Sequence, residues 1–168
     1  MRGPERLRRN ELSPDQIQRA GILCAQFRGL DERDKEHLRI PLDRLNRSKD
    51  RVNTVDSAIE LGIALESLFL TDDEKGEIGF RLRTRTARFL ETEEAARLNT
   101  ALLVRDLYDL RSTAVHTGRL KNMVKRSGTK ARVVVPDLLQ EGYDIVTRAI
   151  VKIIEGGAAL NWKEFDLR

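Results

Sequence analysis

The segment Asn53-Thr-Val-Asp-Ser-Ala-Ile-Glu-Leu-Gly-Ile-Ala-Leu-Glu-Ser-Leu-Phe-Leu70 decides how the rest of this chain folds. Its apolar residues recur at helical spacing on two stripes, one through Ile59 and Phe69 and the other through Leu61 and Leu68. A helix that is apolar on most sides must be covered on most sides, so the segment predicts a central buried helix. Glu66 lies on one of these stripes, and its carboxylate requires a partner there because burying an unpaired charge is costly.

Shorter amphipathic segments flank this central helix on both sides. Ser13-Pro14 predicts a helix start, Thr71-Asp-Asp-Glu74 is a capping-box pattern, and Pro41 predicts a kink or break. The further helices are expected over residues 13–30, 32–47, 71–90, 91–111 and 136–155. The sequence therefore predicts an all-α antiparallel bundle of about five to six helices. Residues 13–168 are expected to form a single domain after a flexible basic arm, residues 1–12.

Composition limits the classes to which the chain can belong. Its 168 residues are 40% hydrophobic and 35% charged, which suits one helical domain with well-solvated outer faces. No apolar run approaches the about 20 residues of a membrane span, so a cytoplasmic protein without membrane contact is expected. Cys24, the single cysteine, excludes an intrachain disulfide and is expected to be a small core residue. The net charge of +4 favours polyanionic partners.

The segment between the last two predicted helices, residues 118–132, contains six basic residues and no acidic one. Its glycine and serine predict a flexible basic loop before the last long helix. Such a loop can bind the phosphates of RNA, or it can be an ordinary solvated loop; it lacks the aromatic residues that stack on bases. Arg81 and Arg85, on a neighbouring helix, either extend an RNA track or form a paired, solvated face. The candidate RNA-contacting residues are thus Arg81, Arg85, Arg119, Lys121, Lys125, Arg126 and Lys130.

Chemistry in this chain depends on few side chains. Of the two histidines, His37 lies in a charged run and is expected to face solvent, whereas His116 follows Arg111 by five residues. No metal-ligand spacing, phosphate-binding glycine loop or nucleophile elbow is present, so neither a metal nor another cofactor is expected. Residues five apart on a helix point about 140° away from each other. Arg111 and His116 can therefore converge only if the helix is interrupted or if two chains bring their copies together. The plainer alternative is a surface ion pair for Arg111 and a helix-capping role for His116.

The string Tyr108-Asp-Leu-Arg-Ser-Thr-Ala-Val-His-Thr-Gly118 resembles the signature of HEPN domains, particularly their Apea-like branch. Upstream, Ile63-Ala-Leu-Glu-Ser-Leu-Phe-Leu70 resembles the central helix of that branch, and Glu77-Ile-Gly-Phe-Arg-Leu-Arg-Thr-Arg-Thr-Ala87 resembles its next helix. Asn161-Trp162 also fits. The resemblance spans roughly residues 38–167, and its two longest motifs occur in the expected order.

The resemblance implies a homodimer in which Arg111 and His116 line a composite RNase cleft, with Ser112, Glu66 and Tyr108 in supporting roles. Ser112 stands where well-studied HEPN RNases often carry Asn, Asp or His. RNA supplies its own nucleophile, the 2′-hydroxyl, so cleavage needs only a base, an acid and positive charge. The resemblance further implies RNA as a partner, an antitoxin or another protein as a second one, and a defence or toxin–antitoxin setting. The alternative is a non-catalytic dimer that binds RNA, a nucleotide or a protein.

Overall fold

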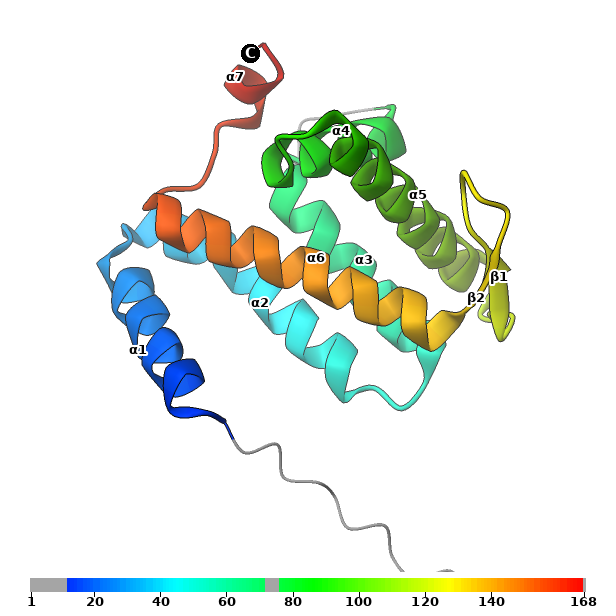
Figure 1. Ribbon diagram of the computed structural model, residues 1–168, viewed down its shortest axis with the longest axis horizontal. Helices are drawn as coiled ribbons and strands as arrows, with labels where there is room; N and C mark the ends of the chain where they lie inside the picture. The colour runs from blue at the N-terminus through cyan, green and yellow to red at the C-terminus, as the bar shows by residue number, and fades with distance from the viewer. Residues whose placement is uncertain (1–11, 72–75, 168) are drawn as a thin grey trace, which may run out of the picture.

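The computed structural model describes residues 12–71 and 76–167, which form an all-α bundle with one small β-hairpin (Figure 1). This confirms the predicted fold class. The elements are α1 (Pro14–Gly29), α2 (Glu32–Asp50), α3 (Thr54–Phe69), α4 (Ile78–Leu90), α5 (Glu94–Thr117), β1 (Met123–Lys125), β2 (Arg132–Val134), α6 (Val135–Gly156) and α7 (Trp162–Asp166).

Helix α3 is the centre of the bundle, as its apolar stripes predict. It contacts α2, α4, α5 and α6, and these helices surround it in the ribbon (Figure 1). The side chains of Leu61, Leu65 and Leu68 are at most 1% exposed. Because every neighbour packs on α3, a residue that α3 presents to α5 is fixed in place by the whole core.

The short C-terminal helix α7 closes one end of the core with an aromatic cluster. The ring centroid of Trp162 lies 5.2 Å from that of Phe69 and 5.8 Å from that of Phe89. Its indole Nε1 donates a hydrogen bond of 2.9 Å to the carbonyl oxygen of Leu68. Phe165 lies edge-on to the Trp162 ring, so both side chains of α7 pack back onto the bundle.

The boundaries of helices α2, α4 and α5 differ from those expected. Helix α2 continues through Pro41 to Asp50, because the proline is buried between Leu38 and Leu45 and packing outweighs the missing hydrogen bond. Helix α4 begins at Ile78, after Glu77 in the left-handed conformation (φ 49°), and not at the capping-box segment, of which residues 72–74 lie outside the described residues. Helix α5 does not end near residue 111 but continues to Thr117.

Residues 118–134, expected to begin with a flexible loop, form a pinned hairpin. Strand β1 pairs antiparallel with β2, with Val124 opposite Val133. Both carboxylate oxygens of Asp106 accept hydrogen bonds of 3.1 Å from the backbone N–H of Ser127, in the hairpin turn. Arg126 forms an ion pair with Glu141 of α6. The hairpin is therefore tied to both α5 and α6.

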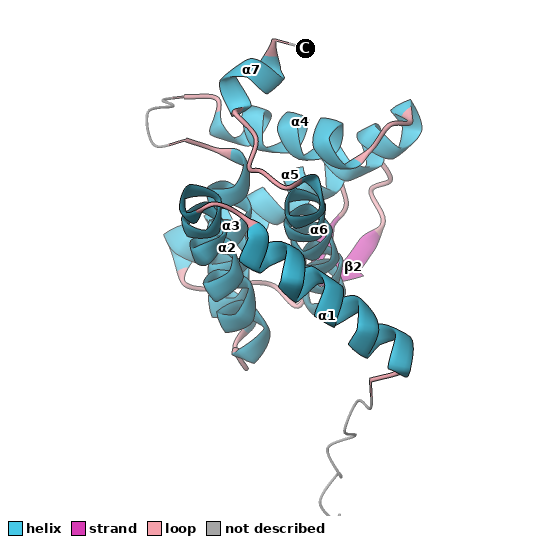
Figure 2. Cartoon of the chain, turned by 90° about the vertical axis from the view of Figure 1, so that its left-hand side faces the viewer, coloured by secondary structure: helices cyan, strands magenta, loops and turns pink. Residues whose placement is uncertain are grey.

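Helix α1 lies against the outside of α6 and has no buried residue (Figure 2). Cys24, expected in the core, is exposed on this helix. The prediction is wrong because the apolar spacing of α1 indicates an amphipathic helix but does not indicate how deeply that helix is buried. Among the described helices, none is both long and apolar enough to cross a membrane.

Candidate functional site

Arg111 and His116 both lie on the last two turns of α5, and the helix is continuous between them. Thr113 and Thr117 donate their hydroxyl hydrogens to the carbonyl oxygens four residues earlier, at 2.8 Å each, without breaking the helix. The interrupted-helix alternative is therefore wrong. Within one chain the two side chains point about 140° apart, so convergence requires a second copy.

Arg111 is held against α3. Its Nη2 donates a hydrogen bond of 3.0 Å to Oε2 of Glu66, the carboxylate for which the sequence requires a partner. Burial raises the pKa of Glu66, and the charge of Arg111 offsets part of that increase. The Arg111 Nε is buried without a hydrogen-bond partner among the described residues. The guanidinium is thus anchored through one terminal nitrogen.

Gly62 makes room for the stem of Arg111. A Cβ atom added at residue 62 would lie 2.3 Å from Cγ of Arg111, a distance that side chains do not tolerate. Gly62 was not among the residues that sequence reasoning selected. The sequence feature that could have identified Gly62 is its position one turn before Glu66 on an otherwise apolar helix. Glycine destabilises the interior of a helix, so its presence there indicates close packing.

We expect Gly62→Ala to lower the free energy of unfolding by about 1–3 kcal/mol, because overpacking forces Arg111 out of its position. The cost should fall clearly in an Arg111→Ala background, where the colliding Cγ is absent. Urea denaturation of the two single variants and the double variant measures this coupling.

Gly142→Ala is the matched control. Its added Cβ would meet Leu61 at 2.6 Å and Leu107 at 2.9 Å as its nearest neighbours, and not Arg111. The cost of Gly142→Ala should therefore be the same with and without Arg111. Equal costs for Gly62→Ala in the two backgrounds would contradict the contact described here.

His116 lies on a part of α5 that α4 does not cover. With 13 and 24 residues, α4 and α5 are about 20 Å and 36 Å long. The start of α4 reaches Tyr108, whose Cε1 would be 3.2 Å from a Cβ at Gly79. Beyond it, Val115 is 48% exposed and His116 is also exposed. We call Ser112, Val115 and His116 the open face of α5; they span an arc of about 100° that adjoins Arg111.

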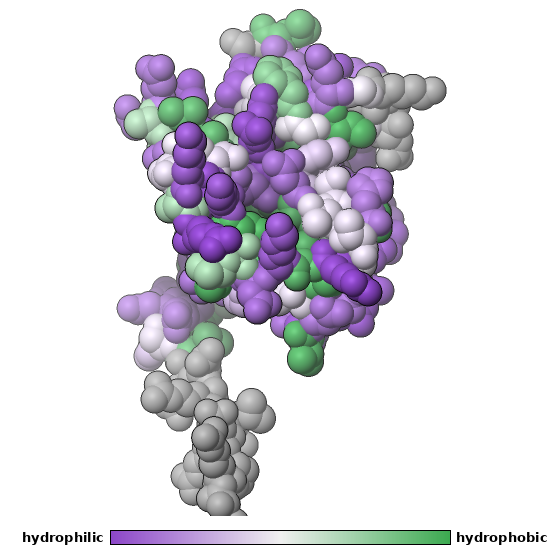
Figure 3. Space-filling view, turned by 90° about the vertical axis from the view of Figure 1, so that its right-hand side faces the viewer, coloured by the Kyte–Doolittle hydropathy of each residue, from purple (hydrophilic) through white to green (hydrophobic). Residues whose placement is uncertain are grey.

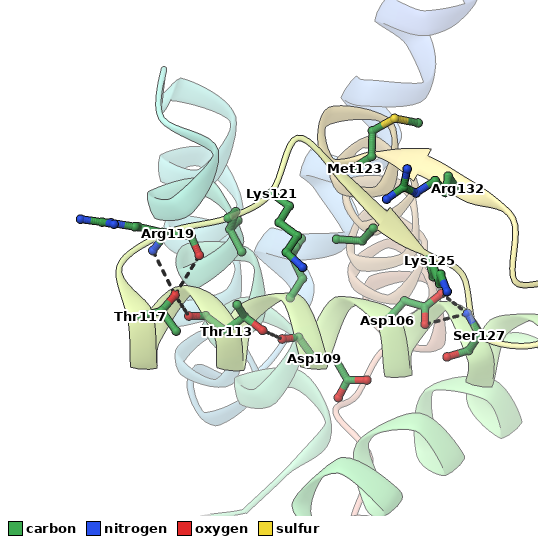
Figure 4. A pocket seen from close by; sticks show the side chains of 13 residues that line it. Asp106, Asp109, Thr113, Thr117, Arg119, Lys121, Met123, Lys125, Ser127 and Arg132 are labelled. Atoms are coloured by element: carbon green, nitrogen blue, oxygen red, sulfur yellow. Dashed lines mark hydrogen bonds between the residues drawn. The ribbon is translucent and has the colours of Figure 1, made fainter.

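The basic hairpin borders a different face of α5. Thr113 and Thr117 line a cleft beneath the hairpin (Figure 4). By helix geometry they point about 160° and 120° away from Arg111. Arg119, Lys121 and Lys125 also line this cleft, whereas Lys130 is exposed in the hairpin turn and Arg126 is paired with Glu141. One chain therefore does not bring Arg111 together with the hairpin cations.

Arg81 and Arg85 do not form one exposed track. Arg85 is 1% exposed, donates to the carbonyl oxygen of Phe69 at 2.8 Å and forms an ion pair of 2.6 Å with Asp166. It links α4 to the C-terminal helix and has no access to RNA, so it is removed from the RNA-contacting set. Arg81 is half-buried. Helical spacing placed both on one ridge but could not predict that Arg85 would be buried against Asp166 of α7.

His37, expected to face solvent, is half-buried, with an Nε2 that has no hydrogen-bond partner among the described residues. It lines a hollow between α2 and residues 158–163. Desolvation lowers the pKa of His37, against the opposing effects of Asp34 and of a backbone hydrogen bond with Leu68. The folded state therefore favours the neutral form of the His37 imidazole.

The lowered pKa predicts a pH dependence of stability. Between the folded-state pKa of His37 and about 6.5, the unfolded chain binds more protons, so the free energy of unfolding should fall as the pH falls through this window. Urea denaturation across this range measures the slope. His37→Gln should remove it, whereas His116→Gln, at the other histidine, should leave it in place. A slope that survives His37→Gln would contradict this assignment.

Within residues 12–71 and 76–167, no three His, Cys, Asp or Glu side chains are grouped so that they could hold a metal ion. The arrangement on α5 instead offers an anchored guanidinium, an imidazole and a hydroxyl on neighbouring faces of one helix. Comparison of the chain with protein-family models, with curated proteins and with solved structures finds no match.

Proposed function

We propose that this chain is a metal-independent endoribonuclease of the HEPN type that acts as a homodimer, with Arg111 and His116 as its catalytic residues. The observation that carries the proposal is the open face of α5. It presents the exposed His116 and the half-buried Ser112 beside an arginine that α3 anchors through Glu66. The resemblance of Tyr108–Gly118 to the HEPN signature supports the same reading.

Each group has a role that its chemistry supports. Histidine titrates in the range needed to take a proton from the 2′-hydroxyl or to give one to the leaving 5′-oxygen. Arg111 has its Nη2 bonded to Glu66, while no described residue bonds its Nη1, which is left to donate to a phosphate oxygen. Ser112 can orient the phosphate. A chain supplies one catalytic histidine, so a base and an acid that are both histidines require two chains.

A two-fold dimer through the open face satisfies this requirement. Two α5 helices that cross at Ser112 and Val115 would place both copies of His116 and of Arg111 around one cleft. Val115 is an exposed apolar residue on this face, and Ile78, at the start of α4, is 38% exposed. Apolar residues ringed by polar ones are typical of protein interfaces.

Disulfide crosslinking tests this dimer. Single cysteines are introduced in a Cys24→Ser background, as Ser112→Cys, Val115→Cys or His116→Cys. Near the two-fold axis, Cβ atoms come within the about 3.5–4.5 Å that a disulfide needs. At least one of the three variants should therefore form a crosslinked dimer on mild oxidation, as measured by non-reducing electrophoresis.

Thr113→Cys is the matched control, since residue 113 is exposed on the same helix but faces the cleft beneath the hairpin. It should remain uncrosslinked under the same oxidation. Crosslinking of Thr113→Cys at the same rate as the best of the three, or crosslinking of none of them, would contradict the proposed arrangement.

RNA, as the proposed substrate, would meet further positive charge at the hairpin. Arg119, Lys121 and Lys130 form no ion pair with any described residue, so they can contact phosphates from outside the catalytic cleft. Binding through such cations weakens steeply as the salt concentration rises. A cytoplasmic defence or toxin–antitoxin role, with an antitoxin or another protein as a partner, belongs to the same proposal and follows from the resemblance alone.

A further inference from the structure

The cleft beneath the hairpin differs in its chemistry from the open face of α5. It has a volume of about 630 Å³ and lies between α5 and the segment 119–132 (Figure 4). Leu110, Leu120 and Val124 supply an aliphatic lining, and Leu120 and Val124 pack against the hydrophobic core. The volume falls in the range of pockets that take small organic ligands.

The hairpin that roofs this cleft is held in place without a ligand. Asp106 binds the backbone of Ser127, and Asn122 accepts a hydrogen bond of 3.0 Å from the backbone N–H of Val135, at the start of α6. At the turn, Gly128 (φ 89°) lies so close to Leu102 that an added Cβ would be 2.9 Å from its Cδ1. The cleft is thus preformed, which lowers the entropic cost of binding.

The rim of the cleft is positively charged. Four cationic side chains line it, and no ion pair joins any of them to a described residue: Arg119, Lys121, Lys125 and Arg132. Two carboxylates also line it, but Asp106 is engaged by Ser127 and Asp109 lies 3.9 Å from Nε of Arg105. The lining therefore carries a net charge of +2, from four cations and two carboxylates, above an aliphatic floor.

The view from the hairpin side shows the same combination at the surface. Hydrophilic side chains dominate this face, and apolar side chains appear between them near its centre (Figure 3). No aromatic side chain lines the cleft, so it offers no stacking partner to a base. A phosphodiester backbone would use the cations but would leave the aliphatic floor uncovered. The ligand that satisfies both features is a small anion with an aliphatic chain.

We propose that this cleft binds an aliphatic carboxylate, with the chain on Leu110, Leu120 and Val124 and the anionic head among Lys121, Lys125 and Arg132. The proposal does not depend on RNA cleavage. It does imply that a bound carboxylate occupies cations that RNA would otherwise contact, so ligand and RNA would compete for the hairpin.

The probes are octanoate, 1-octanol and acetate, titrated against the full chain without RNA while methyl chemical shifts are recorded by NMR. Octanoate should bind saturably, at least about tenfold more tightly than either 1-octanol or acetate, and should shift the methyl signals of Leu110, Leu120 and Val124. Between butanoate and octanoate, each added methylene should tighten binding up to about fourfold, the gain expected when one methylene leaves water. The same result is expected with His116→Ala, so failure of the RNase proposal would leave this one intact.

Lys121→Gln combined with Lys125→Gln should weaken octanoate binding by about tenfold or more, as expected for the loss of two charge-assisted contacts. The matched control is Lys130→Gln, which removes an exposed cation of the same hairpin outside the cleft. It should leave the affinity unchanged, and all variants should unfold at the temperature of the parent. Absence of saturable binding, shifts at methyls elsewhere, equal affinity for acetate or 1-octanol, or equal weakening by Lys130→Gln would each overturn the proposal.

Discussion

His116→Ala is expected to lower the rate of RNA cleavage by about 10²–10⁴-fold, the range over which a positioned proton-transfer group accelerates a reaction. The loss should be this large because a two-fold dimer loses both its base and its acid through one substitution. Since His116 is exposed, its replacement should leave the fold unchanged. The measurement is the initial cleavage rate at fixed RNA concentration, with circular dichroism as a check of folding.

One further variant at Arg111 and one at Thr113 are measured in the same assay. Arg111→Lys keeps a positive charge but loses the planar fork of donors, so we expect it to lose most of the activity as well. Thr113→Ala alters an exposed residue between Arg111 and His116 that faces the hairpin cleft, and it should retain the parent rate. Parent-like cleavage by His116→Ala, or an equal loss in Thr113→Ala, would contradict the assignment of roles.

Trp162→Ala is expected to have the largest effect on stability, lowering the free energy of unfolding by about 3–5 kcal/mol. Trp162 is 2% exposed and joins the short α7 to Phe69 and Phe89 through ring contacts. Its removal leaves a cavity and deprives the carbonyl oxygen of Leu68 of the indole N–H donor. Because the free energy of unfolding of a domain of this size is only about 5–15 kcal/mol, this single change removes a large fraction of it.

Trp162→Phe separates packing from hydrogen bonding. It keeps an aromatic ring in the cluster but removes the indole N–H that donates to Leu68. We expect a smaller loss of about 1–3 kcal/mol, the cost of a buried acceptor left without its donor. Urea denaturation with both variants tests the ranking, and a Trp162→Ala cost below that of Trp162→Phe would show that α7 is not part of the core.

The sequence predicted the core well because the core is set by apolar periodicity. The central position of α3 and the need of Glu66 for a partner both follow from its two stripes. The end of α5 was missed because Ser112, Thr113 and Thr117 favour helix ends when they are considered alone. In the structure, Ala114 is 1% exposed and packs this last turn on the core, so tertiary packing overrides local preference.

The missed features depend on contacts between residues far apart in the chain. The hairpin has strands of three residues, too short for a periodic signal, and is fixed by Asp106, 21 residues before its partner Ser127. Burial of Arg85 depends on Asp166, 81 residues later. The fit of Gly62 to Arg111 likewise joins two helices. No local sequence pattern can predict contacts between residues so far apart. The proposed roles of Arg111 and His116, by contrast, began from a resemblance that rests on the residues from Tyr108 to Gly118 alone.

The chemistry of the cleaved ends tests the central claim most directly. The purified chain is incubated with RNA in the presence of EDTA, and the new ends are identified by mass spectrometry. Attack by the 2′-hydroxyl predicts products with 2′,3′-cyclic phosphate and 5′-hydroxyl ends, formed at an undiminished rate in EDTA and absent when the substrate is DNA. Products with 3′-hydroxyl ends, cleavage abolished by EDTA, or intact RNA would contradict the proposal that this chain is a metal-independent endoribonuclease.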